Sequence, residues 1–137
     1  MSPSSRREAR ERALALLYEA DSKGVDPRTV VAELPVAPEP FVSDLVDGVG
    51  HHAARIDALI GELAREWALD RMPTVDRCLL RLAVYELLEH PDVPVGAVIS
   101  EAVELAKRYS TGDSGRFVNG VLAAAAAQAR GHDPAPS

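Results

Sequence analysis

The segment Cys78–Leu88 constrains the fold most, because it is apolar on nearly every side of a helical wheel. Only Arg81 and Glu86 interrupt its apolar surface. A helix that is hydrophobic all round is stable in water only when other elements cover it. The sequence therefore predicts a central, buried helix that begins at Pro73 and is broken by the segment His90–Pro94.

Several other segments have the apolar spacing of amphipathic helices. Neither the alternation of a half-buried strand nor an Asn-Gly hairpin signal is present. We therefore expect an all-α fold of about six to seven helices. Apolar stripes at helical spacing run over Ala9–Ala20, Val30–Leu34, Phe41–Ala53, Ile56–Trp67, Val98–Tyr109 and Phe117–Ala125.

Small polar residues, glycines and prolines mark the ends of these helices. Ser5–Glu8 fits a capping box for the first helix, and Gly24 is expected to end it. Asp26-Pro27 has the pattern of an N-cap followed by a first-turn proline. The segment Gly48–His52 is expected to bend or divide its region into two helices.

The length of 137 residues suits one domain with a sizeable core. The proline-rich stretch at 35–40 separates an N-terminal group of helices from a C-terminal group. We expect two subdomains, of about residues 5–69 and 73–130, that pack as one unit because each alone is small. Residues 131–137 are expected to form a frayed, flexible tail.

The single cysteine, Cys78, excludes a disulfide framework and suits a reducing cytoplasm. No apolar run approaches the roughly 20 residues that cross a bilayer, and the N-terminus lacks the apolar core of a signal peptide. We therefore expect a cytoplasmic protein without membrane contact. The net charge of −6 argues against general nucleic-acid binding but allows a local basic patch, because exposed charges are screened beyond about 8 Å.

Enzymatic chemistry finds little support in the residues. The chain lacks an HExxH motif, a CxxC pair and a Walker loop. His51 and His52 diverge by about 100° on a helix and cannot jointly bind a metal, as a hydrolase would need. Cys78 is expected to be an inert core thiol, and Glu86 and Glu101 to be surface carboxylates. We predict no catalytic residue, no metal site and no cofactor.

Arginines cluster at the start of the first helix. Arg6, Arg7 and Arg10 fall within an arc of about 100° on the wheel, and Tyr18 lies about 20° beyond Arg7. An arginine can donate two hydrogen bonds to one phosphate, so the cluster can bind a nucleic-acid backbone. The alternative is a solvated helix end that forms salt bridges with nearby glutamates.

A polar turn, Ser110–Asp113, joins the last two helical patterns. Asp113 or Ser114 can cap the final helix, and Arg116 and Phe117 follow in its first turn. A cation beside an aromatic ring can hold a phosphate and stack an unpaired base. Core packing is the alternative for Phe117, and the two roles are compatible if one ring face stays exposed.

Three blocks of sequence, in the same order and over nearly the whole chain, resemble the bacterial NusB family of transcription antitermination factors. The resemblance implies two small helical bundles without catalytic activity. It also implies binding to the single-stranded boxA element of nascent ribosomal RNA transcripts, as a heterodimer with the ribosomal protein NusE in an antitermination complex on RNA polymerase. The blocks are Arg6–Arg10 with Ala15–Tyr18, Val75–Arg77 with Leu80–Leu87, and Asp92–Pro94 with Glu101–Lys107, Asp113-Ser114 and Phe117–Leu122.

The resemblance also assigns roles by position. Tyr18 and Asp76 match positions that face NusE, and Asp76 stands where glutamate is frequent, so its reach is one methylene shorter. Some family members self-associate, and the residues leave open whether this chain forms a homodimer. A protein-only helical adaptor without RNA binding is the alternative function. The implied RNA contacts are Arg6, Arg7, Arg10, Asp113, Arg116 and Phe117.

Overall fold

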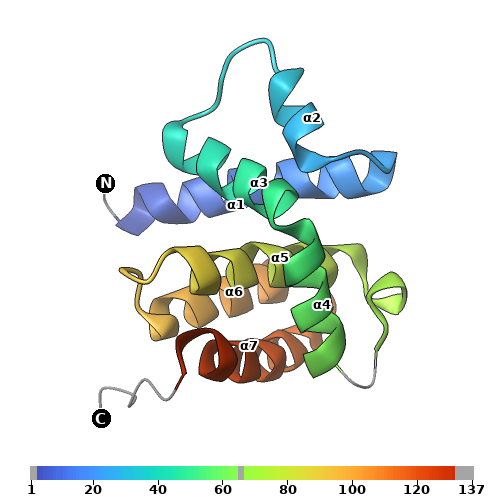
Figure 1. Ribbon diagram of the computed structural model, residues 1–137, viewed down its shortest axis with the longest axis vertical. Coiled ribbons are helices and arrows are strands. Elements are labelled where there is room, and N and C mark those ends of the chain that lie inside the picture. Colours follow the sequence, from blue (N-terminus) through green and yellow to red (C-terminus); the bar gives the residue numbers. More distant parts are fainter. Residues whose placement is uncertain (1–2, 65–66, 132–137) are drawn as a thin grey trace.

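The computed structural model describes residues 3–64 and 67–131, and every regular element within these ranges is a helix (Figure 1). The predicted all-α fold is confirmed. No described helix is both long and apolar enough to cross a membrane. The elements are α1 (Pro3–Lys23), α2 (Pro27–Ala32), α3 (Pro40–His51), α4 (Ala53–Leu63), the short 3-10 helix η1 (Leu69–Arg71), α5 (Thr74–Glu89), α6 (Val95–Tyr109) and α7 (Ser114–Arg130).

Helix α5 is the centre of the molecule, as predicted from its apolar sequence. It packs against α1 and α3 on one side and against α4, α6 and α7 on the other (Figure 1). Most of its residues are buried, including Leu80 and Val84, which have no exposed surface. Cys78 is buried in the core, as predicted, and burial raises the pKa of its thiol to about 12, which disfavours the reactive thiolate.

Most of the predicted helix ends are confirmed. Gly24 follows α1 with a positive φ of 66°, which glycine adopts without strain. The Asp26 carboxylate caps α2 by accepting the Arg28 backbone N–H at 2.8 Å. The Gly48–His52 region ends α3 and begins α4. The capping box is wrong, because α1 begins at Pro3 and Ser5 therefore lies inside the helix.

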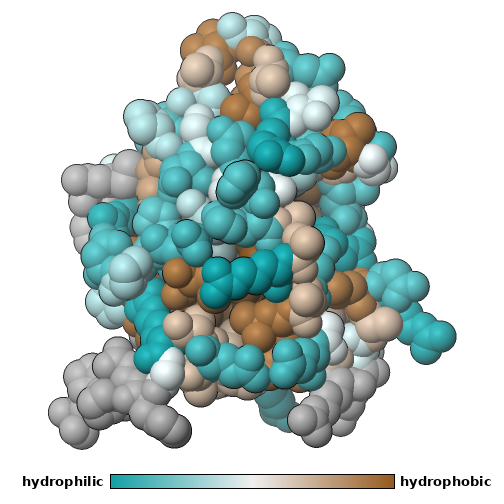
Figure 2. All heavy atoms as spheres, in the orientation of Figure 1, coloured by the Kyte–Doolittle hydropathy of each residue, from teal (hydrophilic) through white to brown (hydrophobic). Residues whose placement is uncertain are grey.

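The helices form an upper group, α1 to α3, and a lower group, α4 to α7, and α5 of the lower group contacts both (Figure 1). Helix α4 packs mainly on α5 and α7 rather than on α3. Gly48 permits the close approach of α3 to α5, because a Cβ at this position would overlap the ring of Tyr85. The face in Figure 2 is largely hydrophilic. Val36, in the connection between α2 and α3, is an exposed apolar residue.

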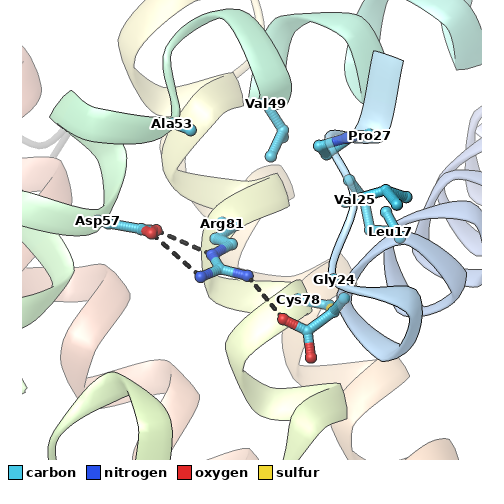
Figure 3. A pocket seen from close by; sticks show the side chains of 11 residues that line it. Leu17, Gly24, Val25, Pro27, Val49, Ala53, Asp57, Cys78 and Arg81 are labelled. Carbon is cyan, nitrogen blue, oxygen red and sulfur yellow. Dashed lines mark hydrogen bonds and ion pairs between the residues drawn. The ribbon is translucent and has the colours of Figure 1, made fainter. Parts of the chain in front are cut away.

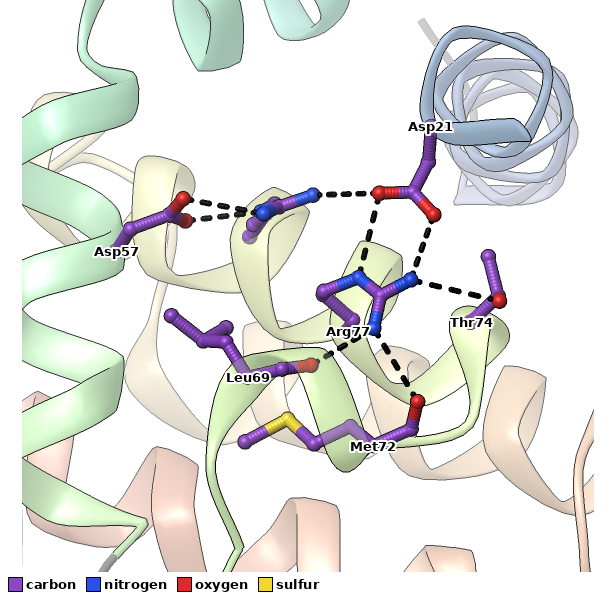
Figure 4. A network of polar contacts seen from close by, with 7 residues as sticks. Asp21, Asp57, Leu69, Met72, Thr74 and Arg77 are labelled. Carbon is purple, nitrogen blue, oxygen red and sulfur yellow. Dashed lines mark hydrogen bonds and ion pairs between the residues drawn. The ribbon is translucent and has the colours of Figure 1, made fainter. Parts of the chain in front are cut away.

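Carboxylates and arginines join the two groups beside a cavity of about 250 Å³ (Figure 3). Arg81 of α5 donates to Asp57 of α4 at 2.8 and 3.0 Å and to Asp21 of α1 at 3.1 Å. Arg77 donates to the same Asp21 at 2.6 and 3.2 Å and to the carbonyl oxygen of Leu69 at 2.7 Å (Figure 4). One carboxylate thus connects two arginines, and the network fixes α1 and α4 against α5.

Candidate nucleic-acid interface

The turn between α6 and α7 lines an open cavity of about 490 Å³. Trp67, in the connection after α4, and Pro73, immediately before α5, also line it. The fold therefore brings together residues that lie more than forty positions apart in the sequence. The lining residues are Trp67, Pro73, Asp76, Thr111, Asp113, Ser114, Arg116 and Phe117.

Asp76 connects the start of α5 to this turn. Its carboxylate oxygens accept hydrogen bonds from the hydroxyls of Ser110 and Ser114 at 2.5 and 2.9 Å. The Thr111 hydroxyl lies 2.9 Å from the Ser114 hydroxyl and extends the network. Asp76 is 3% exposed, and a buried carboxylate needs such partners to offset its loss of hydration. Asp76 thus positions the turn, and its carboxylate is occupied within the chain.

The first turn of α7 presents Arg116 and Phe117 at the cavity. Arg116 is exposed, and within residues 3–64 and 67–131 no carboxylate lies at ion-pair distance from it. Phe117 is half-buried, packs against the core and also lines the cavity, so both of its predicted roles are compatible with its position. Asp113 precedes the helix, is exposed and makes no capping hydrogen bond. A cation, a ring and a carboxylate therefore meet at one opening.

Trp67 is a site residue that the sequence pattern misses. Its spacing predicts a place on the apolar stripe of the preceding helix, but α4 ends at Leu63 and Trp67 is 45% exposed. Its ring lies next to that of Phe117, with the ring centroids 6.2 Å apart and the planes inclined by 44°. No periodic signal could place this ring, because its position depends on where α7 packs.

The predicted arginine cluster divides into three environments. Arg6 is half-buried, and its guanidinium carbon lies 5.7 Å from the centre of the Phe41 ring. The exposed Arg7 donates to both carboxylate oxygens of Glu101 on α6, at 3.1 and 2.7 Å. These hydrogen bonds raise the pKa of Arg7 and lower that of Glu101. Arg7 therefore reaches solvent while it is already paired, as the alternative interpretation of this cluster predicted.

Arg10 is buried, in contrast to the surface position expected for the whole cluster. It is 5% exposed and donates to both carboxylate oxygens of Glu86, at 2.9 and 2.8 Å. Burial disfavours its charge, but the hydrogen bonds and the attraction of Glu86 outweigh burial and raise the pKa of Arg10. The expectation that Glu86 is a surface carboxylate is wrong, because Glu86 is 1% exposed. Arg10 thus fastens α1 to α5, and its guanidinium faces away from solvent.

The start of α1, with its arginines, and the cavity lie beside opposite ends of the second half of α6. Arg7 contacts α6 at Glu101, whereas the cavity begins beyond the helix end at Ser110. Nine residues of helix separate these points, or about 14 Å. Tyr18, three turns after Arg7 on α1, is 45% exposed. Within the described ranges, no group of three potential metal ligands is present.

Comparison with known proteins gives the same family by sequence and by structure. Residues 7–127 match the model of the NusB family. The chain is 51% identical over 126 residues to the transcription antitermination protein NusB of Acidothermus cellulolyticus, covering 88% of this chain and 86% of that protein. It is 50% identical over 125 residues to the NusB of Salinispora tropica, covering 86% and 92%.

Two solved structures have the same fold. T. maritima NusB superposes with a TM-score of 0.80 at 34% identity, covering 96% of this chain and 93% of that one. A chain in a crystal structure of antitermination factors NusB and NusE in complex with dsRNA superposes with a TM-score of 0.77 at 32% identity, covering 93% and 99%. The match of the family model over most of the chain, together with these identities, shows that the protein belongs to the NusB family.

Proposed function

We propose that this protein is a transcription antitermination factor that binds the boxA element of nascent ribosomal RNA transcripts together with NusE, within an antitermination complex on RNA polymerase. The cavity at the α6–α7 turn carries this proposal, because it combines an exposed cation without a described partner and an aromatic ring. Family membership supports it, since a solved relative is an antitermination factor held with NusE and RNA.

The proposed RNA surface combines the cavity with the start of α1. Arg116 would contact a phosphate, and the half-buried Phe117 ring would stack an unpaired base. Asp113 would accept hydrogen bonds from amino groups on a base edge. Arg6 and Arg7 would hold the strand farther along, where a phosphate competes with Glu101 for Arg7. Arg10 contributes indirectly in this scheme, because it anchors α1 and lies 3.8 Å from Glu101.

Removal of the exposed arginines is expected to weaken RNA binding and its dependence on salt. Each phosphate contact on a single strand contributes about −0.7 to the slope of log K against log salt concentration. Arg116→Ala should therefore flatten the slope by about 0.7, and Arg6→Ala with Arg7→Ala by up to about 1.4. Gel shifts at several salt concentrations would measure this with boxA-like, scrambled and double-stranded RNA, each with and without NusE.

Arg12→Ala is the matched control, because Arg12 is an exposed arginine on α1 that points away from the cluster. It should leave the slope unchanged. Arg10 stays intact in these variants, since its loss would leave the Glu86 charge buried and unpaired. An unchanged slope in Arg116→Ala would remove this residue from the RNA surface. If no RNA binds at low salt with or without NusE, the protein-only adaptor replaces the proposed function.

Tyr18 is the proposed contact to NusE. Exposed tyrosines are frequent anchors of protein interfaces, and losing one costs about 2 kcal/mol or more. Tyr18→Asp should therefore weaken NusE binding by at least about 30-fold in calorimetry. Val36→Asp, which adds the same charge to a different exposed apolar position, should leave the affinity unchanged. Equal NusE affinity of Tyr18→Asp and the wild type would exclude Tyr18 from the interface.

The direct partner contact predicted for Asp76 finds less support in the geometry. Its carboxylate binds Ser110 and Ser114 and is 3% exposed. In the proposed complex, Asp76 acts by holding the α6–α7 turn in place, and NusE would have to displace these hydroxyls to reach it.

A further inference from the structure

We infer that Trp67 and Phe117 form a two-ring platform on which two successive unpaired bases of one RNA strand stack. Arg116 holds the phosphate that links these two bases. This inference rests on the proposed function and adds to it a binding residue, Trp67, that lies outside the α6–α7 turn. It also defines the ligand as an unpaired stretch of at least two nucleotides.

The position of the Trp67 ring is set by contacts on both sides of it. Its backbone N–H donates to the carbonyl oxygen of Ala64, the buried residue that follows α4, at 3.2 Å. Its ring contacts Phe117, which packs against the core. An indole that is 45% exposed nevertheless leaves a large apolar surface in water. A ring that is both held and exposed is what a stacking platform requires.

The angle between the rings decides how bases can bind. The planes are inclined by 44° with their centres 6.2 Å apart, so neither ring covers the other in a flat stack. Trp67 is 45% exposed and Phe117 is half-buried, so each ring keeps exposed surface on which a separate base can stack. A cavity of about 490 Å³ also lies within the usual range of ligand pockets, about 300 to 1,000 Å³.

The charges around the cavity orient the strand. Among the described residues that line it, Arg116 is the only cation, so the linking phosphate belongs beside Arg116. Asp113 repels a phosphate but accepts hydrogen bonds from base amino groups, so the base edges belong on its side. Among residues 3–64 and 67–131, Arg116 has no carboxylate at ion-pair distance. A cation of this kind beside two rings favours a nucleic-acid strand, whose phosphate can pair with Arg116, over an apolar protein segment, which cannot.

The chain contains one tryptophan, so its intrinsic fluorescence reports from this cavity alone. Titration of the full-length protein with a single-stranded boxA-like RNA should quench the emission of Trp67. Acrylamide should then quench the bound protein less than the free protein, because a stacked base shields the indole. Double-stranded RNA of the same sequence should leave the emission unchanged, since its bases are not available for stacking.

Three substitutions separate stacking from apolar packing. Trp67→Phe keeps an aromatic face and should bind RNA with an affinity within about threefold of the wild type, because only a small stacking area is lost. Trp67→Leu and Trp67→Ala remove the face and should each weaken binding by about tenfold. Thermal unfolding of all three variants checks that they fold, and salt titrations should give the same slope as the wild type, because no phosphate contact is lost.

The outcomes distinguish this inference from the proposed function. RNA binding by the wild type without quenching, or with equal affinities in Trp67→Leu and Trp67→Phe, would overturn the platform and leave the proposed function intact. A fluorescence change on adding NusE alone, with none on adding RNA, would make the ring pair a protein contact and also overturn it. Failure of every RNA to bind would reject the proposed function itself.

Discussion

Replacing Glu86 with glutamine is expected to lower the free energy of unfolding by about 3 to 5 kcal/mol. The pair of Glu86 and Arg10 is held by two hydrogen bonds of 2.8 and 2.9 Å, and both side chains are almost completely buried. The substitution leaves the Arg10 guanidinium in the core beside a neutral group. Its remaining carboxylate, Glu101, is 3.8 Å away, too far for a good hydrogen bond.

Chemical and thermal denaturation would measure the loss, which corresponds to a fall in Tm of about 10 to 20 °C. Lys23→Ala provides the control, because it breaks an exposed pair with Glu19 one turn away on α1 and should cost at most about 0.5 kcal/mol. The double variant Arg10→Met with Glu86→Leu should be much more stable than Glu86→Gln, since it leaves no buried charge. A loss below about 1 kcal/mol in Glu86→Gln would show that Arg10 is not buried as a charged pair.

Replacing Asp21 with asparagine is expected to cost about 2 to 3 kcal/mol at neutral pH, less than for a fully buried pair. Asp21 is the carboxylate that joins Arg77 and Arg81, and its side chain is 19% exposed. Its loss frees both arginines and weakens the attachment of α1 to α5. Asp57→Asn should cost less, because Asp57 binds only Arg81 and is 33% exposed.

The cost of Asp21→Asn should depend on pH. Hydrogen bonds from Arg77 and the attraction of Arg77 and Arg81 lower the pKa of Asp21. A carboxylate with a lowered folded pKa stabilises the protein above its unfolded pKa, about 3.9, and this contribution is lost as pH falls through the folded value. The difference in unfolding free energy between wild type and variant should therefore be constant near neutrality and shrink below about pH 4.

Urea denaturation between pH 2.5 and 7 would test this dependence, with Asp92→Asn as the control because Asp92 is an exposed acid in the turn before α6. The control should differ little from the wild type at every pH. A difference between wild type and Asp21→Asn that grows as the solution becomes more acidic would contradict the predicted sign.

Buried polar groups also hold the proposed RNA surface in place. Arg10 and Glu86 fix the start of α1, where Arg6 and Arg7 reach solvent, and Asp76 fixes the turn that presents Arg116. Buried charged groups therefore position the exposed cations without contacting a ligand.

The helices could be predicted from the sequence because their signals are local. Apolar spacing identified the amphipathic segments, and the all-round apolar segment Cys78–Leu88 identified the central helix. Gly24 and Asp26-Pro27 marked ends that depend only on backbone conformation and a neighbouring side chain. The family resemblance, which rests on the order of short blocks, was also available from the sequence alone and is confirmed by the comparisons.

The tertiary structure alone decided which polar residues face solvent and which rings face each other. A wheel places Arg7 and Arg10 on neighbouring sides of α1. Only the packing of α5 and α6 pairs Arg10 with buried Glu86 and Arg7 with partly exposed Glu101. Likewise, Trp67 meets Phe117 only because α7 packs beside the connection that follows α4. Helix periodicity is encoded over a few residues, whereas burial of a charge or exposure of a ring depends on segments far apart in the chain.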